Sequence, residues 1–132
     1  MSTLFSKIVN GEINAFKIAE DTRFLAFLDV FPLAKGHVLV IPKQEIDYIF
    51  DIEDDVLSDM MVFSKKVAKA IQKAIPCKRI GVAVIGLEVP HAHIHLVPLQ
   101  TVQDINFTRE KMKLDQEELQ EISQKIKQYI SL

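Results

Sequence analysis

The chain has a single cysteine, Cys77, among 132 residues, and this shortage excludes a fold held by intrachain disulfide bonds. Four glycines and five prolines are too few for a collagenous or disordered chain. A basic excess is also missing, because 16 lysines and arginines stand against 18 aspartates and glutamates. We therefore expect no nucleic-acid partner, since non-specific binders of nucleic acids normally carry a large positive charge.

Long apolar runs are absent as well. The longest stretch, residues 80–87 (IGVAVIGL), is far shorter than the roughly 18 residues of a membrane-spanning helix. The first seven residues lack the basic region and the run of about 7–15 apolar residues that form a secretory signal. We expect no membrane partner and a cytoplasmic location, which a lone free thiol also suits.

The composition that remains, 48% hydrophobic and 26% charged, is that of an ordinary globular protein. Its length predicts one domain over residues 1–132. Apolar runs predict neighbouring strands at 24–30 and 36–42, and a hairpin of strands at 79–85 and 92–99. Apolar residues three or four apart predict a helix of about 20 residues from Glu53 and a second helix over 114–132, capped at Asp115 and with Tyr129 in its apolar stripe. The expected fold class is α+β, an antiparallel sheet flanked by two helices.

Three of the four histidines fall in one short segment, at His91, His93 and His95, and the fourth is His37. Alternate side chains of a strand share a face, so the three imidazoles should project together while Ala92 and its equivalents enter the core. A lone histidine in a core is commonly structural, but three at strict alternation favour a functional site.

Two chemistries fit such a row of imidazoles. Imidazole binds zinc or copper, although a structural zinc site prefers four ligands and the chain adds only Cys77 and Glu88 to the histidines. Imidazole with an ordinary pKa of about 6.5 is also largely neutral at physiological pH, and it can act as a nucleophile beside a second histidine that moves a proton. The residues alone leave both readings open.

The segment His-Ala-His-Ile-His-Leu-Val, residues 91–97, resembles the motif His-φ-His-φ-His-φ-φ (φ apolar) of the histidine triad (HIT) family of nucleotide hydrolases and transferases. Residues 5–13, 24–29 and 35–43 resemble further segments of that family in the same order. The resemblance covers most of the chain. It implies the family fold, a purine nucleotide as substrate, a homodimer, and chemistry that needs no metal or other cofactor.

The resemblance also implies a role for each matching residue. His93 would attack the α-phosphorus of the nucleotide and form a nucleotidyl-histidine intermediate that water then cleaves. His95 would hydrogen-bond the phosphate or the leaving group, while His91 and His37 would orient His93. Asp29 would accept hydrogen bonds from the ribose hydroxyls. The apolar wall around the base would be formed by Phe5, Ile8, Phe27 and Val30.

A few positions depart from the pattern of the family. Leu87 stands where many members have a glutamine, and the loop before the triad is short, which implies fewer polar contacts to the phosphate. Glu88 is a candidate for contacting the leaving group, with a solvated charge as the alternative. Some relatives bind zinc through a Cys-x-x-Cys near the start, and Thr3 and Ser6 stand in its place, which argues against that metal site.

The resulting hypothesis is a hydrolase that acts on P–N or P–O–P bonds of nucleotides, of phosphoramidate or dinucleoside polyphosphate type. Nucleotidyl transfer is the variant of the same chemistry. Two other classes stay open: a nucleotide-binding or regulatory protein with vestigial activity, which Leu87 favours, and a His-rich metal-binding module.

Overall fold

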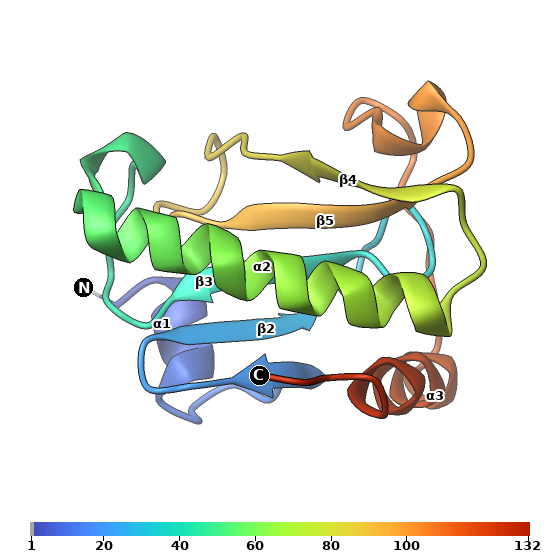
Figure 1. The fold of residues 1–132 in the computed structure, drawn as a ribbon, viewed down its shortest axis with the longest axis horizontal. Helices are drawn as coiled ribbons and strands as arrows, with labels where there is room; N and C mark the ends of the chain where they lie inside the picture. Colours follow the sequence, from blue (N-terminus) through green and yellow to red (C-terminus); the bar gives the residue numbers. More distant parts are fainter. Residues whose placement is uncertain (1) are drawn as a thin grey trace.

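The computed structural model describes residues 2–132 and contains a five-stranded antiparallel sheet with three α-helices (Figure 1). The predicted α+β fold is confirmed, and the sheet has the strand order β1-β2-β3-β5-β4. Its strands are β1 (Lys17–Glu20), β2 (Phe24–Leu28), β3 (Val38–Pro42), β4 (Arg79–Ala83) and β5 (Ile94–Leu99). The helices are α1 (Leu4–Val9), α2 (Asp54–Ala74) and α3 (Gln116–Lys127), with short 3-10 helices η1 (Ile49–Asp51) and η2 (Val102–Ile105).

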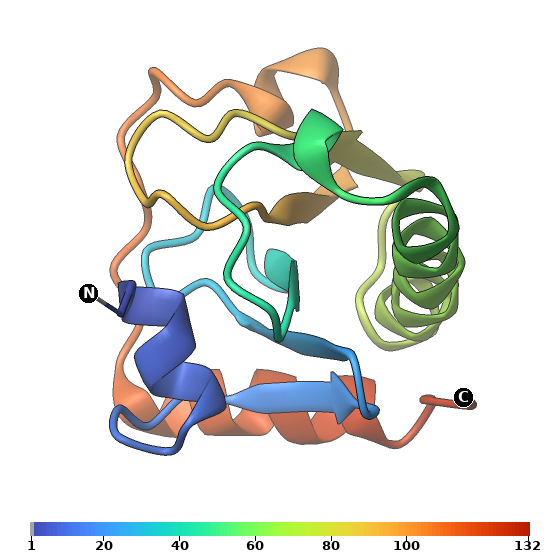
Figure 2. The same ribbon diagram turned by 90° about the vertical axis from the view of Figure 1, so that its left-hand side faces the viewer.

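The sheet is covered on both faces. α2 and α3 pack on one face, and α1 lies on the opposite side (Figure 2). Because side chains alternate along a strand, neighbouring residues of β2 enter different layers. Phe24 and Ala26 pack in the layer of α2 and α3, whereas Phe27 packs in the layer of α1. This alternation separates a large core from a smaller layer that α1 closes.

The long helix α2 follows from its sequence. It spans 21 residues after Glu53 as N-cap, as the apolar spacing predicts. Asp54 and Asp55 lie in its first turn and Lys73 in its last, which places each charge at the favourable end of the helix dipole. Its buried side chains line the large core. Within residues 2–132, no helix combines the length and the apolar character that crossing a membrane requires.

The predicted first residue of the strand over 92–99 was wrong. β5 begins at Ile94, so only His95 of the triad lies on a strand. The backbone explains the difference: β3 and β5 pair no further than Val40 and Ile94, and the N–H of Ala92 donates instead to the carbonyl of Ile46 at 2.7 Å. The partner strand β4 likewise ends at Ala83 rather than at residue 85.

Other predicted bounds also needed correction. The strands expected over 24–30 and 36–42 are the shorter β2 and β3, which are antiparallel neighbours as predicted. α3 ends at Lys127, so Tyr129 lies beyond it and is 45% exposed instead of joining the apolar stripe. α1, a third helix beside the two expected, and β1 were not predicted, because segments of six and four residues carry too little periodicity.

Candidate active site

All four histidines lie buried on the face of the sheet that α1 covers. Ala92 and Ile94 belong to the opposite, large core, so the imidazoles between them point the other way. Phe5 of α1 packs edge-on against His93, with ring centroids 5.0 Å apart, and His93 in turn lies 4.9 Å from the ring of His95. The triad is therefore a continuous row of rings beneath α1.

The tautomer of the central histidine, His93, follows from one hydrogen bond. Its Nδ1 lies 2.7 Å from the carbonyl oxygen of His91, and a carbonyl oxygen can only accept. We therefore assign the proton to Nδ1. Nε2 then carries a lone pair, has no hydrogen-bond partner among residues 2–132, and belongs to a side chain that lines a cleft of about 720 Å³.

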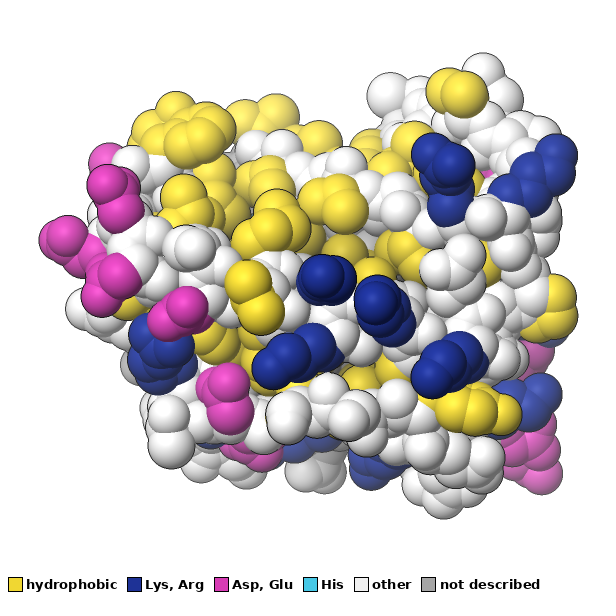
Figure 3. Space-filling view, viewed as in Figure 1, with side chains coloured by type: hydrophobic (Ala, Val, Ile, Leu, Met, Phe, Trp, Pro, Cys, Tyr) yellow, Lys and Arg dark blue, Asp and Glu magenta, His cyan; other side chains and the backbone are white. Residues whose placement is uncertain are grey.

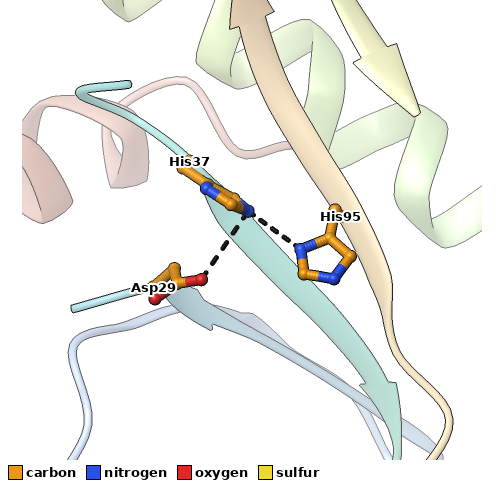
Figure 4. Close-up of side chains that lie close together, drawn as sticks. All are labelled: Asp29, His37 and His95. Carbon is orange, nitrogen blue, oxygen red and sulfur yellow. Dashed lines mark hydrogen bonds and ion pairs between the residues drawn. The ribbon is translucent and has the colours of Figure 1, made fainter. Parts of the chain in front are cut away.

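His95 is held by a chain of donors and acceptors that runs through His37 (Figure 4). The N–H of Leu33 donates to Nδ1 of His37 at 3.1 Å, so the proton of His37 sits on Nε2. That Nε2–H donates to Nδ1 of His95 at 2.9 Å, which leaves the proton of His95 on Nε2. Burial lowers the pKa of His37 to about 3 and that of His95 to about 4. Both rings are neutral at pH 7, as this chain requires.

Asp29 lies directly after β2 and beside His37. Its Oδ1 accepts the N–H of Phe31 at 2.9 Å, and its Oδ2 lies 3.7 Å from Nε2 of His37 (Figure 4). Burial raises the pKa of the Asp29 carboxyl, while the N–H of Phe31 and the charge of Lys111 oppose the shift. The second oxygen remains available to a polar ligand.

The structure bears on the metal-binding hypothesis. Within the described part of the chain, one group of three side chains could hold a metal ion: Asp29, His37 and His95, whose ligand atoms lie within 4.8 Å of one another. The group contains a single member of the triad, and the hydrogen bond between His37 and His95 already engages the two nitrogen atoms that face each other. The triad itself is not assembled as a ligand set in residues 2–132.

His91, at the other end of the row, is held by groups of a different kind. Its Nε2 lies 2.8 Å from the carbonyl oxygen of Pro42 and therefore carries the proton. Its Nδ1 accepts from the hydroxyl of Thr3 at 2.8 Å, and the same hydroxyl oxygen accepts the N–H of Ser6 at 3.0 Å. Burial lowers the pKa of His91, so this ring is also neutral at pH 7.

Glu45 completes this end of the site. One carboxylate oxygen accepts the Ser6 hydroxyl at 2.6 Å and the backbone N–H of Thr3 at 2.8 Å. These two hydrogen bonds, that from Ser6 first, hold the pKa of Glu45 below its usual range. The two hydroxyl residues that replace a Cys-x-x-Cys thus connect the start of α1 to His91.

The cleft in front of His93 has an apolar wall and a polar rim. Phe5, Ile8 and Phe27, the residues expected to surround the base, are buried and line the wall of the cleft. Val30 also lines the cleft but is 41% exposed, so it belongs to the rim. Glu88 lines the rim as an exposed side chain, next to Leu87.

The HIT-domain family model matches residues 10–102, more than half of the chain. The chain belongs to the HIT family. It is 32% identical to an HIT-like protein of Borreliella burgdorferi over 131 residues, covering 93% of this chain and 94% of that one. It is 38% identical to the adenosine 5′-monophosphoramidase of Schizosaccharomyces pombe, covering 74% of each chain. The crystal structure of a Hit-like protein from Bartonella henselae superposes with a TM-score of 0.85 at 29% identity, over 98% of this chain and 97% of the other.

Three contributors to this HIT-family site were missed in the sequence. Glu45 gives no local signal, because its partners lie 39 and 42 residues away. Phe107 and Lys111 line the cleft from the connection between β5 and α3, outside the residues that the HIT-domain model matches. Lysines and phenylalanines are common, so only the fold could single these two out.

Proposed function

We propose that the protein is a hydrolase that releases a purine nucleoside monophosphate through a covalent intermediate on His93. The observation that carries this proposal is the tautomer of His93, whose Nδ1–H is engaged at 2.7 Å and whose Nε2 keeps its lone pair on a side chain that lines the cleft. An unprotonated imidazole nitrogen held in one orientation is a competent nucleophile at neutral pH. The phosphoramidase activity named for the S. pombe relative supports the same chemistry here.

The proposed reaction has two displacement steps at the α-phosphorus. In the first, Nε2 of His93 forms a bond to phosphorus, the bond to the leaving group breaks, and the leaving group takes up a proton. In the second, a water oxygen bonds to phosphorus as the N–P bond breaks, and the water releases a proton. His95 also lines the cleft, and its Nε2–H would donate to a phosphate oxygen or to the leaving atom.

The remaining cleft residues fit a nucleoside. The flat wall made by Phe5, Phe27 and Ile8 offers apolar contact to a purine base. The free oxygen of Asp29 at the end of β2 would accept hydrogen bonds from the ribose hydroxyls. Of the leaving groups, an amine in a phosphoramidate and a phosphate in a dinucleoside polyphosphate are both compatible with this cleft.

Release of AMP tests the proposal. Adenosine phosphoramidate and a diadenosine polyphosphate would each be incubated with wild-type protein and with His93→Ala, with and without a chelator. We expect wild-type protein to turn over at least one substrate regardless of the chelator, and His93→Ala to lose about 10⁴-fold or more. Tight nucleotide binding without turnover of either substrate would instead support a binding protein. Turnover that the chelator abolishes would support a metal-dependent site.

The proposal includes a homodimer formed along the β4 edge of the sheet. β4 ends the strand order, so its outer edge has no partner strand among residues 2–132, and its Val82 is 50% exposed. Beside this edge lies a cavity of about 570 Å³, lined chiefly by apolar side chains of η1, α2 and residues 84–86, among them Phe50, which is 73% exposed. Figure 3 shows apolar side chains gathered over this part of the molecule. An apolar patch beside an open strand edge suits a second copy of the chain.

Sedimentation tests the dimer. We expect wild-type protein at micromolar concentration to sediment as a dimer, and Val82→Lys to sediment as a monomer because each subunit would present a charge to the other. Lys69→Glu, a charge change at an exposed position of α2 outside the lining of this cavity, serves as the control. A monomeric wild-type protein, or a Val82→Lys dimer of unchanged affinity, would contradict the proposal.

A further inference from the structure

The connection between β5 and α3, residues 100–115, contributes Phe107, Thr108 and Lys111 to the lining of the cleft and is fixed to the body of the protein. At the start of η2, the Asp104 carboxylate accepts the N–H of Gln100 at 2.7 Å and that of Thr101 at 2.9 Å. The guanidinium of Arg109 donates to the carbonyl of Leu33, and the N–H of Met112 donates to the carbonyl of Pro32 at 2.9 Å. Residues on this connection therefore hold defined positions beside the active site.

Phe107 places this connection at the His95 end of the row. Its ring packs edge-on against His95 with centroids 4.7 Å apart, and against His37 at 6.3 Å. Phe5 packs at the other side of His93. The rings thus follow one another in the order Phe5, His93, His95, Phe107. With the base against the wall at Phe5 and the α-phosphorus at His93, the space at Phe107 is left for the leaving group.

Lys111 brings a positive charge to this same space. It lines the cleft together with Asp29, His93 and His95, and it is half-buried. Its positive charge favours the ionised form of Asp29 and the neutral forms of His37 and His95, which lowers the pKa of each against the effects of the other groups. Among residues 2–132 it forms no ion pair, and it is the one lysine or arginine that lines the cleft.

We propose that Lys111 determines specificity by binding a negative charge on the leaving group, so that the enzyme prefers nucleotides whose leaving group is anionic over those whose leaving group is neutral. The inference rests on the proposed function, since it assigns Lys111 to the same cleft. An ammonium group in a half-buried cleft, fixed by an anchored connection, interacts with an anion more strongly than a free surface lysine does. The cleft contains two acids, Asp29 and Glu88, and neither forms an ion pair with Lys111.

Two substrates with the same P–N bond allow the effect of a charge on the leaving group to be measured separately from the effect of the bond that is broken. Adenosine 5′-phosphoramidates of β-alanine and of β-alaninamide differ only in a carboxylate on the leaving amine. We expect kcat/KM of the wild-type protein to be about tenfold higher for the carboxylate. Lys111→Gln should bring the ratio of the two values close to one, and Lys111→Arg should retain most of the preference. Lys113→Gln, an exposed lysine two residues away, is the matched control and should leave the ratio unchanged.

Binding to His93→Ala protein gives a readout that does not depend on turnover. By calorimetry, His93→Ala should bind the carboxylate ligand about tenfold more tightly than the amide, and His93→Ala with Lys111→Gln should bind both equally. If the carboxylate ligand binds more tightly but the wild-type protein turns over neither substrate, the role of Lys111 is upheld and the proposed hydrolysis is rejected. Turnover with equal use of both substrates, or an equal loss on both in Lys111→Gln, would overturn the role of Lys111.

Discussion

At one end of the triad, His91 is held by a hydroxyl and a carbonyl, while at the other end His95 is held by another imidazole. The hydroxyl and carbonyl that hold His91 carry no titratable group. The imidazole that holds His95 is titratable, although burial lowers its pKa to about 3, and its proton position depends on the N–H of Leu33. We therefore expect the His91 end to serve as a fixed support for His93, and the His95 end to respond to acid and to nearby charges.

The largest effect should come from removing the partner of His95. His37→Ala deletes a buried ring, leaves Nδ1 of His95 and the N–H of Leu33 without partners, and frees His95 to change tautomer. We expect the free energy of unfolding to fall by about 3 kcal/mol and kcat by about 100-fold. Urea unfolding and steady-state kinetics measure both. His37→Gln, which retains a donor, should recover part of kcat; wild-type rates in His37→Ala would show that the imidazole chain is dispensable.

The free energy of unfolding lost in acid should differ between the two ends, and for each ring it should be smaller than the loss caused by His37→Ala. His37 and His95 have folded-state pKa values of about 3 and 4, below their ordinary 6.5, so the unfolded chain binds protons first. Stability is then complete above about pH 6.5 and declines as the pH falls toward the folded values. Asp29, whose pKa is raised, contributes in the opposite direction. We expect each of these two rings to contribute a loss of about 2 kcal/mol between pH 7 and pH 5, which Asp29 partly offsets.

Urea unfolding at both pH values checks this dependence. His37→Gln should be less sensitive to acid than the wild type, because one of the three buried rings with a lowered pKa is gone. Thr3→Val should retain the full dependence, since the hydroxyl it removes does not titrate. An identical pH dependence in His37→Gln and wild type would place the acid sensitivity elsewhere.

A smaller effect is expected at the His91 end. Thr3→Val keeps the shape of the side chain but removes the donor to His91 and the acceptor for the N–H of Ser6. His91 still donates to Pro42, so its ring retains one of two restraints. We expect a loss of about 1 kcal/mol and a fall in kcat of about fivefold with little change in KM. Thr3→Ser should restore both; a loss as great as that of His37→Ala would erase the distinction between the ends.

The smallest effect should follow Glu45→Gln. The carboxylate is reached by solvent, and an amide oxygen in its place can still accept from Ser6 and from the N–H of Thr3. We expect a lower thermal midpoint than the wild type but a higher one than Thr3→Val, with kcat unchanged. Thermal unfolding of the three proteins side by side provides the ranking, and a Glu45→Gln protein as unstable as Thr3→Val would show that the negative charge itself is needed.

Much of the fold could be predicted because its signals are local. α2 follows from apolar residues spaced three or four apart, and β2 and β3 from short apolar runs next to each other. The histidine motif and the segments around it were sufficient to predict the family. The start of β5 was not predictable, because it depends on whether the N–H of Ala92 donates to β3 or to Ile46.

By itself, the sequence determined the α+β fold, the long helices and the grouping of the three triad imidazoles on the side away from Ala92 and Ile94. These properties depend on the periodic spacing of apolar residues, which can be recognised from neighbouring residues without knowing the tertiary structure. Tertiary structure alone decided which nitrogen of His91 and of His95 holds the proton and which charges line the cleft. A ring nitrogen takes its state from the donor or acceptor opposite it, and the partners of these two rings, Thr3, Pro42 and His37, lie between 49 and 88 residues away in the chain.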